Sequence, residues 1–132
     1  MAVSEIVRAV DLAILKLLDI NHPDRKSLDA LLPIATGMDP TMLQHNFSHY
    51  LKTFRSLQLN RFIAEDFGNS QLLDAFQPRV TGGWTKATGA DLITHVWAGN
   101  VPGLPLWSLI SGLLVKAGTL GKVSGEIGRA HV

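Results

Sequence analysis

The feature that most restricts how this chain can fold lies in residues 92–124. Residues 92–98 form an apolar run of β-formers, which is typical of a strand buried on both faces. A turn over 99–103 follows, then an apolar helical pattern over 105–117 and a second strand pattern over 119–124. A strand, a helix and a strand in this order predict a parallel pair of strands, and therefore an α/β sheet.

The first half of the chain has the three- and four-residue apolar spacing of amphipathic helices. This spacing predicts one helix over 4–18, with Ser4 as its N-cap, and a short second helix over 27–35. Asp39 followed by Pro40 predicts the start of a third helix, because Asp caps free amides and Pro fits the first helical position.

The character of the sequence changes near Pro78. Before it, helical spacing continues to Gly68, the expected terminator, with one further turn expected over 70–76. After it, the β-formers of 80–88 surround a Gly-Gly pair and predict a hairpin or an extended arm.

Composition narrows the classes of function. Twelve basic and eleven acidic residues give a net charge of +1, and they are spread along the chain. This gives no electrostatic case for nucleic acid or an anionic membrane as a partner.

The most apolar segment, 104–115, is too short for the roughly twenty residues that span a bilayer. The chain has no cysteine, and so no disulfide, thiolate metal site or cysteine nucleophile of its own. We expect a cytoplasmic protein.

The Gly-Asn-Val-Pro turn is the most informative short motif. Gly99 lets the chain leave the strand sharply, and Pro102 suits the first turn of a helix. Together they place Asn100 at the carboxyl end of a strand, the edge where ligands bind open α/β sheets. An Asn amide there could donate a hydrogen bond to a developing oxyanion, an effect worth roughly 3 kcal/mol. The spacing alone favours the plainer interpretation, which is ordinary turn chemistry.

Three runs of sequence, 95–103, 108–116 and 121–124, together resemble the acyl-CoA reductase family. That family includes the fatty-acid reductase subunit of bacterial luminescence and belongs to the aldehyde dehydrogenase superfamily. The similarity is dense over 92–125 and looser over 73–79 and the helical segment before it. It implies a Rossmann-like sheet that binds NADPH, and a cysteine thiolate that attacks a fatty acyl-CoA or acyl thioester, which is reduced to the aldehyde. It further implies a homo-oligomer or a partner acyl-transfer subunit.

The resemblance also assigns roles to individual residues. Asn100 matches the side-chain amide of the oxyanion site, and Gly99 and Pro102 shape the turn beside the cofactor. Lys122 matches the lysine that approaches the adenosine ribose, and Ser124 would lie near the same ribose or its 2′-phosphate. The alternatives are a solvated strand end for Lys122 and a helix cap for Ser124.

The resemblance divides the chain into a helical N-terminal segment, 1–76, and the start of a nucleotide-binding domain, 77–125. Residues 126–132 match an in-frame translation of a common sequencing adapter, so we expect them to be foreign and the natural protein to continue. Without the family's cysteine, we expect the 132 residues alone to be inactive. Two alternatives are another aldehyde dehydrogenase-like oxidoreductase and a small, non-catalytic interaction module that docks a partner through 40–67.

His45 and His49 are spaced so that two imidazoles could face one metal ion, but the zinc-protease pattern would need Glu where Asn46 stands. We therefore predict a solvated helix face there and no metal site.

The aromatic residues are assigned to packing. We expect Trp97 and Trp107 in the core and Trp84 exposed near the Gly-Gly pair. His95 is expected to be a hydrogen-bonded core histidine and not a catalytic base.

Overall fold

The computed structural model describes residues 1–98 and 103–123, which form a mixed α/β structure. The helical part contains α1 (Val3–Leu18), α2 (Pro23–Thr36), α3 (Pro40–Leu51), the short 3₁₀ helix η1 (Lys52–Phe54), α4 (Ser56–Phe67) and the 3₁₀ turn η2 (Ser70–Leu73). The rest contains β1 (Gln77–Pro78), β2 (Trp84–Thr85), β3 (Leu92–Val96), α5 (Leu104–Leu114) and β4 (Gly118–Lys122).

The helix starts confirm some of the predicted caps and correct others. Asp39 accepts a hydrogen bond from the Met42 amide at 2.9 Å, as its pairing with a following proline predicts. Ser4 as the first cap was wrong, because α1 already begins at Val3 and Ala2 is its N-cap. The free amide of Ala2 is satisfied by the Glu5 carboxylate at 2.7 Å, so the helix starts without a capping hydroxyl.

The helix ends follow the glycines. Gly37 and Gly68 terminate α2 and α4 with positive φ angles of 68° and 71°. The helix predicted over 27–35 begins earlier, at Pro23, with His22 as its N-cap. The terminator predicted at Gly68 is therefore confirmed, whereas the predicted start of the second helix is wrong.

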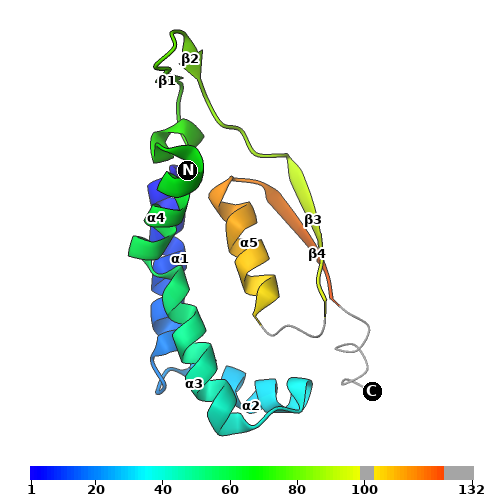
Figure 1. Cartoon of the computed structure of the whole chain (residues 1–132). Coiled ribbons are helices and arrows are strands. Elements are labelled where there is room, and N and C mark those ends of the chain that lie inside the picture. Colours follow the sequence, from blue (N-terminus) through cyan, green and yellow to red (C-terminus); the bar gives the residue numbers. More distant parts are fainter. Residues whose placement is uncertain (99–102, 124–132) are drawn as a thin grey trace.

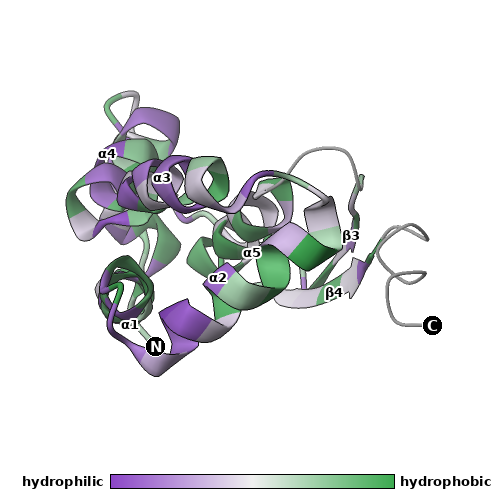
Figure 2. Cartoon of the chain, turned by 90° about the horizontal axis from the view of Figure 1, so that it is seen from below, coloured by the Kyte–Doolittle hydropathy of each residue, from purple (hydrophilic) through white to green (hydrophobic). Residues whose placement is uncertain are grey.

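Seen from the side, the long helices and the β3–β4 sheet form three layers (Figure 1). Helix α5 lies in the middle, with α1, α3 and α4 on one side and the β3–β4 sheet on the other (Figure 2). We call the layer formed by α1, α3 and α4 the helical layer. Strands β3 and β4 are parallel, with Leu92 opposite Gly118 and Val96 opposite Lys122. The parallel strand pair predicted from 92–124 is therefore confirmed.

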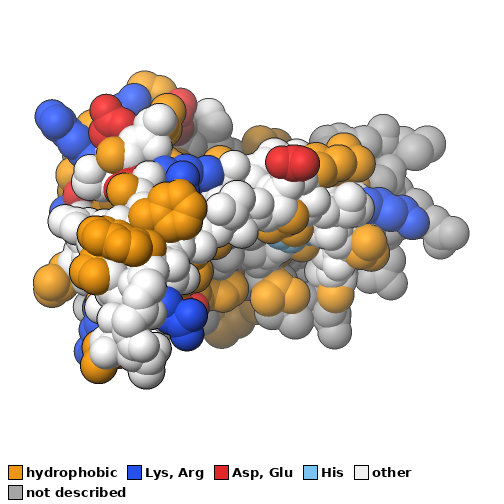
Figure 3. Space-filling model, turned by 90° about the horizontal axis from the view of Figure 1, so that it is seen from above, with side chains coloured by type: hydrophobic (Ala, Val, Ile, Leu, Met, Phe, Trp, Pro, Cys, Tyr) orange, Lys and Arg blue, Asp and Glu red, His pale blue; other side chains and the backbone are white. Residues whose placement is uncertain are grey.

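The predicted hairpin is present at one end of the molecule. Strands β1 and β2 pair antiparallel, and Gly82 and Gly83 both adopt positive φ in the turn. Viewed from that end, the surface carries hydrophobic side chains beside basic ones (Figure 3). Trp84 is 69% exposed, as predicted.

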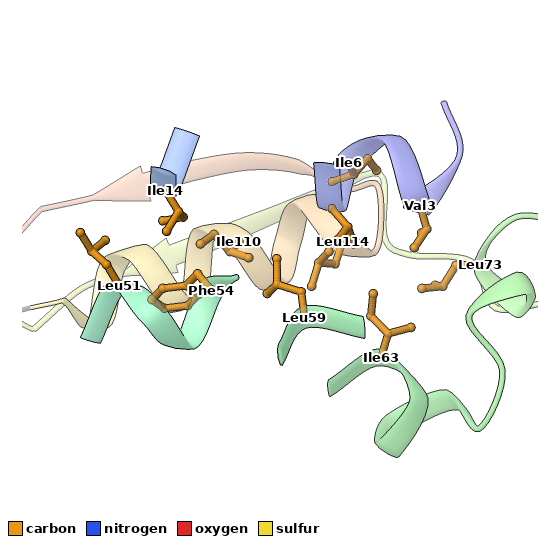
Figure 4. Close-up of a cluster of buried hydrophobic side chains, with 11 residues drawn as sticks. Val3, Ile6, Ile14, Leu51, Phe54, Leu59, Ile63, Leu73, Ile110 and Leu114 are labelled. Carbon is orange, nitrogen blue, oxygen red and sulfur yellow. The ribbon is translucent and has the colours of Figure 1, made fainter. Parts of the chain in front are cut away.

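One hydrophobic core joins the helices (Figure 4). Buried side chains reach it from α1, α3, η1, α4, η2 and α5; they are Val3, Ile6, Val7, Ile14, Leu51, Phe54, Leu59, Ile63, Leu73, Ile110 and Leu114. Each such burial stabilises the fold by about 1.5–3 kcal/mol relative to an exposed side chain. Because Ile110 and Leu114 belong to this core, α5 is held to the helices as well as to the strands.

A buried arginine links the first three helices. Arg25 is fully buried, and its guanidinium donates to the Leu17 and Gln44 carbonyls and to the side chains of Asp29 and Ser48. A charge without water must be paired in this way, and Asp29 supplies the opposite charge at 2.8 Å.

The prediction that the first strand is buried on both faces was wrong. Along β3, half-buried and exposed residues alternate; Leu92 is 58% exposed and Val96 is 76% exposed. On β4, Leu120 is 58% exposed. The reason is that, in the described part of the chain, α5 covers one face of the sheet and no second layer covers the other.

Candidate functional site

The candidate site lies at the carboxyl ends of β3 and β4. These strand ends and the amino end of α5 lie toward the end of the molecule that carries α2 and α3, away from the β1–β2 hairpin (Figure 1). The strands stay joined to their last residues, since the Trp97 amide donates to the Lys122 carbonyl at 3.0 Å. In open α/β sheets this is the edge at which ligands bind.

Of the five residues predicted for the site, the structure places one. Lys122 is the last residue of β4, and its side chain is exposed at the carboxyl edge of the sheet. Gly99, Asn100, Pro102 and Ser124 lie outside the described residues. Their roles therefore stay predictions, and the placement of Lys122 is compatible with a cofactor contact and with a solvated strand end.

Tyr50 is a residue of this region that the sequence analysis missed. Its hydroxyl donates a 2.6 Å hydrogen bond to the Gly103 carbonyl, which ties α3 to the start of α5. Burial raises the pKa of the Tyr50 phenol above its usual value, so it stays a donor at neutral pH. The sequence did contain a signal for this contact, because Tyr50 lies on an otherwise apolar helix face. A Tyr hydroxyl that is buried on such a face needs a hydrogen-bond partner.

Gly103 fits this contact for two reasons. Its φ of 88° lies in the left-handed region that favours glycine. A Cβ at this position would also lie 2.6 Å from a ring carbon of Tyr50. The residue that follows the Gly-Asn-Val-Pro motif is thus held closely by the helical layer.

Beside the strand ends, α5 and the sheet share a polar contact. Nδ1 of His95 on β3 shares a short hydrogen bond with the Ser108 hydroxyl on α5, and the imidazole stacks on Trp97 with ring centres 5.8 Å apart. Nε2 of His95 has no partner within the described structure, nor has the buried Thr119 hydroxyl. The prediction of a hydrogen-bonded core histidine is therefore correct for one ring nitrogen only.

Of the two tryptophans predicted to lie in the core, Trp107 packs against it, whereas the prediction was wrong for Trp97, which lies on the sheet. Trp107 lies against the core, with its ring centre 4.8 Å from that of Phe62 and 5.5 Å from that of Phe54. Trp97 is half-buried and covers Gly121 on the neighbouring strand, where a Cβ would come within 2.0 Å of the indole.

Two apolar cavities flank the helical layer. One, of about 250 Å³, is lined by Met38, Leu43, Asn46, Phe47 and Tyr50. The other, of about 410 Å³, is lined by Met1, Ile6, Ala9, Val10, Leu113, Lys116 and Ala117. We call them the α3 cavity and the α1 cavity.

His45 and His49 are both exposed on α3. Within residues 1–98 and 103–123, no group of three or more His, Asp or Glu side chains could hold a metal ion. Over the same residues, no helix has the length and apolar character needed to cross a membrane.

Comparison with known proteins gave one match. The family model described as acyl-CoA reductase (LuxC) matches residues 1–127, which include both the helical layer and the β3–α5–β4 unit. Neither a curated protein nor a solved structure matched the chain.

Proposed function

Because the chain belongs to the acyl-CoA reductase (LuxC) family, we propose that it forms the N-terminal part of an enzyme that reduces a fatty acyl thioester to an aldehyde with NADPH. The observation that carries the proposal is the extent of the match, which covers the helices and the strands together. That extent argues against a separate helical interaction module.

The parallel β3–β4 pair supports the cofactor half of this proposal. Its carboxyl edge is open to solvent at Lys122, whose ammonium could pair with the 2′-phosphate of NADPH. With this assignment, β3–α5–β4 would be the first unit of a Rossmann-like sheet, and Lys122 at the end of β4 would contact the cofactor.

The chemistry then divides between this chain and a cysteine outside these 132 residues. The cysteine thiolate attacks the acyl carbonyl, and the CoA thiolate leaves. When bound beside Lys122, NADPH would supply the hydride that reduces the enzyme-bound thioester to the aldehyde, with release of the cysteine thiolate. Asn100 would donate a hydrogen bond to the oxyanion of each tetrahedral intermediate.

The test is acyl-CoA-dependent oxidation of NADPH by the complete enzyme, with the aldehyde product measured alongside. We expect Lys122→Met to raise KM for NADPH about ten-fold, the order of a lost charge-assisted hydrogen bond, and to change KM for NADH less. Lys52→Met, at an exposed lysine of η1, is the matched control. An enzyme that contains the cysteine and oxidises no NADPH with any acyl-CoA would refute the proposal. Equal effects of Lys122→Met on both cofactors would refute the role of Lys122.

A further inference from the structure

We propose that the α3 cavity binds the apolar chain of the acyl substrate, so that the helical layer selects substrate by chain length. This inference depends on the proposed function and names residues of this chain that would contact the substrate.

The lining of the cavity suits a hydrocarbon chain. Met38, Leu43, Phe47 and Tyr50 present apolar or aromatic surface, and Asn46 is the one amide among the lining side chains. Leu43 is buried, whereas Met38 and Asn46 are exposed, so the cavity has a closed inner wall and an open rim. An alkyl chain that leaves water for such a surface gains roughly 0.8 kcal/mol for each buried methylene group.

The position of the cavity connects it to the reacting end of the substrate. Tyr50 lines the cavity and also donates its hydrogen bond to the Gly103 carbonyl. In the sequence, Gly103 follows Pro102 directly and lies close to Asn100, the proposed oxyanion donor. A substrate held at this edge of the sheet, where α5 begins, would therefore have the α3 cavity beside it for its chain.

The larger α1 cavity is at the wrong end of the sheet for this role. Its lining residue Ala117 directly precedes Gly118, where β4 begins. The reacting edge is at Lys122, the other end of the same strand, roughly 13 Å away at the usual rise of a strand. A chain would have to cross the length of β4 before it entered the α1 cavity.

The three methionines give a direct way to distinguish the cavities. Met38 lines the α3 cavity, Met1 lines the α1 cavity, and Met42 lines neither. We would titrate the chain, labelled with ¹³C at the methionine methyl groups, with decanoyl-CoA and separately with acetyl-CoA. We expect a saturable shift of the Met38 resonance with decanoyl-CoA only. No shift, a shift at Met1 instead, or equal shifts with acetyl-CoA would overturn the proposal.

A second measurement uses the complete enzyme. Asn46→Trp would fill the cavity from its exposed rim, and His45→Trp puts the same side chain at the neighbouring exposed position, outside the lining. We expect Asn46→Trp to lower the ratio of kcat/KM for decanoyl-CoA to that for acetyl-CoA about ten-fold, and His45→Trp to leave the ratio unchanged.

The two failures are distinguishable. An active enzyme whose chain-length ratio is the same for Asn46→Trp, His45→Trp and wild type would overturn the cavity assignment and leave the proposed function standing. A wild-type enzyme that contains the cysteine and is inactive with both decanoyl-CoA and acetyl-CoA would contradict the proposed function itself.

Discussion

The helical layer and the β3–β4 sheet lie on opposite sides of α5, and they differ in how completely their apolar side chains are buried. The helices enclose a core in which Leu51, Phe54 and Leu59 have no exposed surface. The sheet leaves the side chains of Val96 and Leu120 more than half exposed on its outer face. In the described part of the chain, each of its strands has one hydrogen-bonded neighbour.

The difference follows from what each element needs. A helix satisfies its backbone hydrogen bonds internally and has to bury only one face, so a few helices can complete a core between them. A strand in a parallel sheet needs neighbours along its edges and cover on both faces. Helix α5 belongs to both regions, because it buries Ile110 and Leu114 against the helices while Ser108 hydrogen-bonds to His95 in the sheet.

The largest effect is expected from truncating the centre of the helical core. Phe54 is fully buried and contacts Tyr50 and Trp107 through its ring. We expect Phe54→Ala to lower the free energy of unfolding by about 4 kcal/mol, because it leaves a cavity as well as losing apolar contacts. Urea denaturation followed by circular dichroism measures this.

The matched control is Leu57→Ala, since Leu57 is 77% exposed a few residues along the chain. We expect a change of about 0.5 kcal/mol or less there. Equal losses for the two variants would mean that the helical layer has no closed core.

An intermediate effect is expected where α1 meets α4. The Arg55 guanidinium holds the pKa of the Asp11 carboxyl below its usual value, as does the hydrogen bond from the Ser56 amide at 2.9 Å. The stability that Asp11 contributes is therefore fully present above its ordinary pKa, near pH 4, and is lost as pH falls through the lower folded value. We expect Asp11→Ala to cost about 1 kcal/mol at neutral pH, in the range of a lost helix cap.

The pH dependence provides the check on this assignment. The loss of stability below about pH 4 should be smaller in Asp11→Ala than in wild type, because one titrating group is gone. Asp74, whose pKa is lowered by its ion pair with Lys116, remains in both proteins and keeps part of the acid sensitivity. If the free energy of unfolding depended on pH in the same way in wild type and Asp11→Ala, the titration of Asp11 would not be linked to folding.

The smallest effect is expected on the open face of the sheet. Leu120→Thr replaces an exposed apolar side chain with a β-branched polar one that suits a strand. We expect the free energy of unfolding to change by less than about 0.5 kcal/mol. A loss of about 2 kcal/mol or more would show that this face is covered.

The sequence predicted the elements better than it predicted their surroundings. Asp39-Pro40, Gly68 and the Gly-Gly pair are local signals, because each acts through the backbone of its own turn, and each prediction was confirmed. The parallel pair could be predicted as well, since the order strand, helix, strand restricts the topology.

Burial and long-range contacts were not predictable in the same way. The composition of β3 is that of a fully buried strand, but how much of it is covered depends on which layers are present. The links from Tyr50 to Gly103 and from Asp11 to Ser56 join residues far apart in the sequence, and no local pattern announces them. In the candidate site, the sequence correctly predicted that Lys122 lies at the end of the second strand. The role of Asn100 as an oxyanion donor rests on the resemblance and on the family match.

The most direct test of the contrast between the two regions is amide hydrogen exchange, resolved to peptides by mass spectrometry. We predict that amides of α1 and α5 exchange at least about ten-fold more slowly than those of β3 and β4, because the helices surround a closed core and each strand has a single neighbour. Equal protection of β3, β4 and α1 would contradict the account, since it would mean that the sheet is as complete as the helical layer.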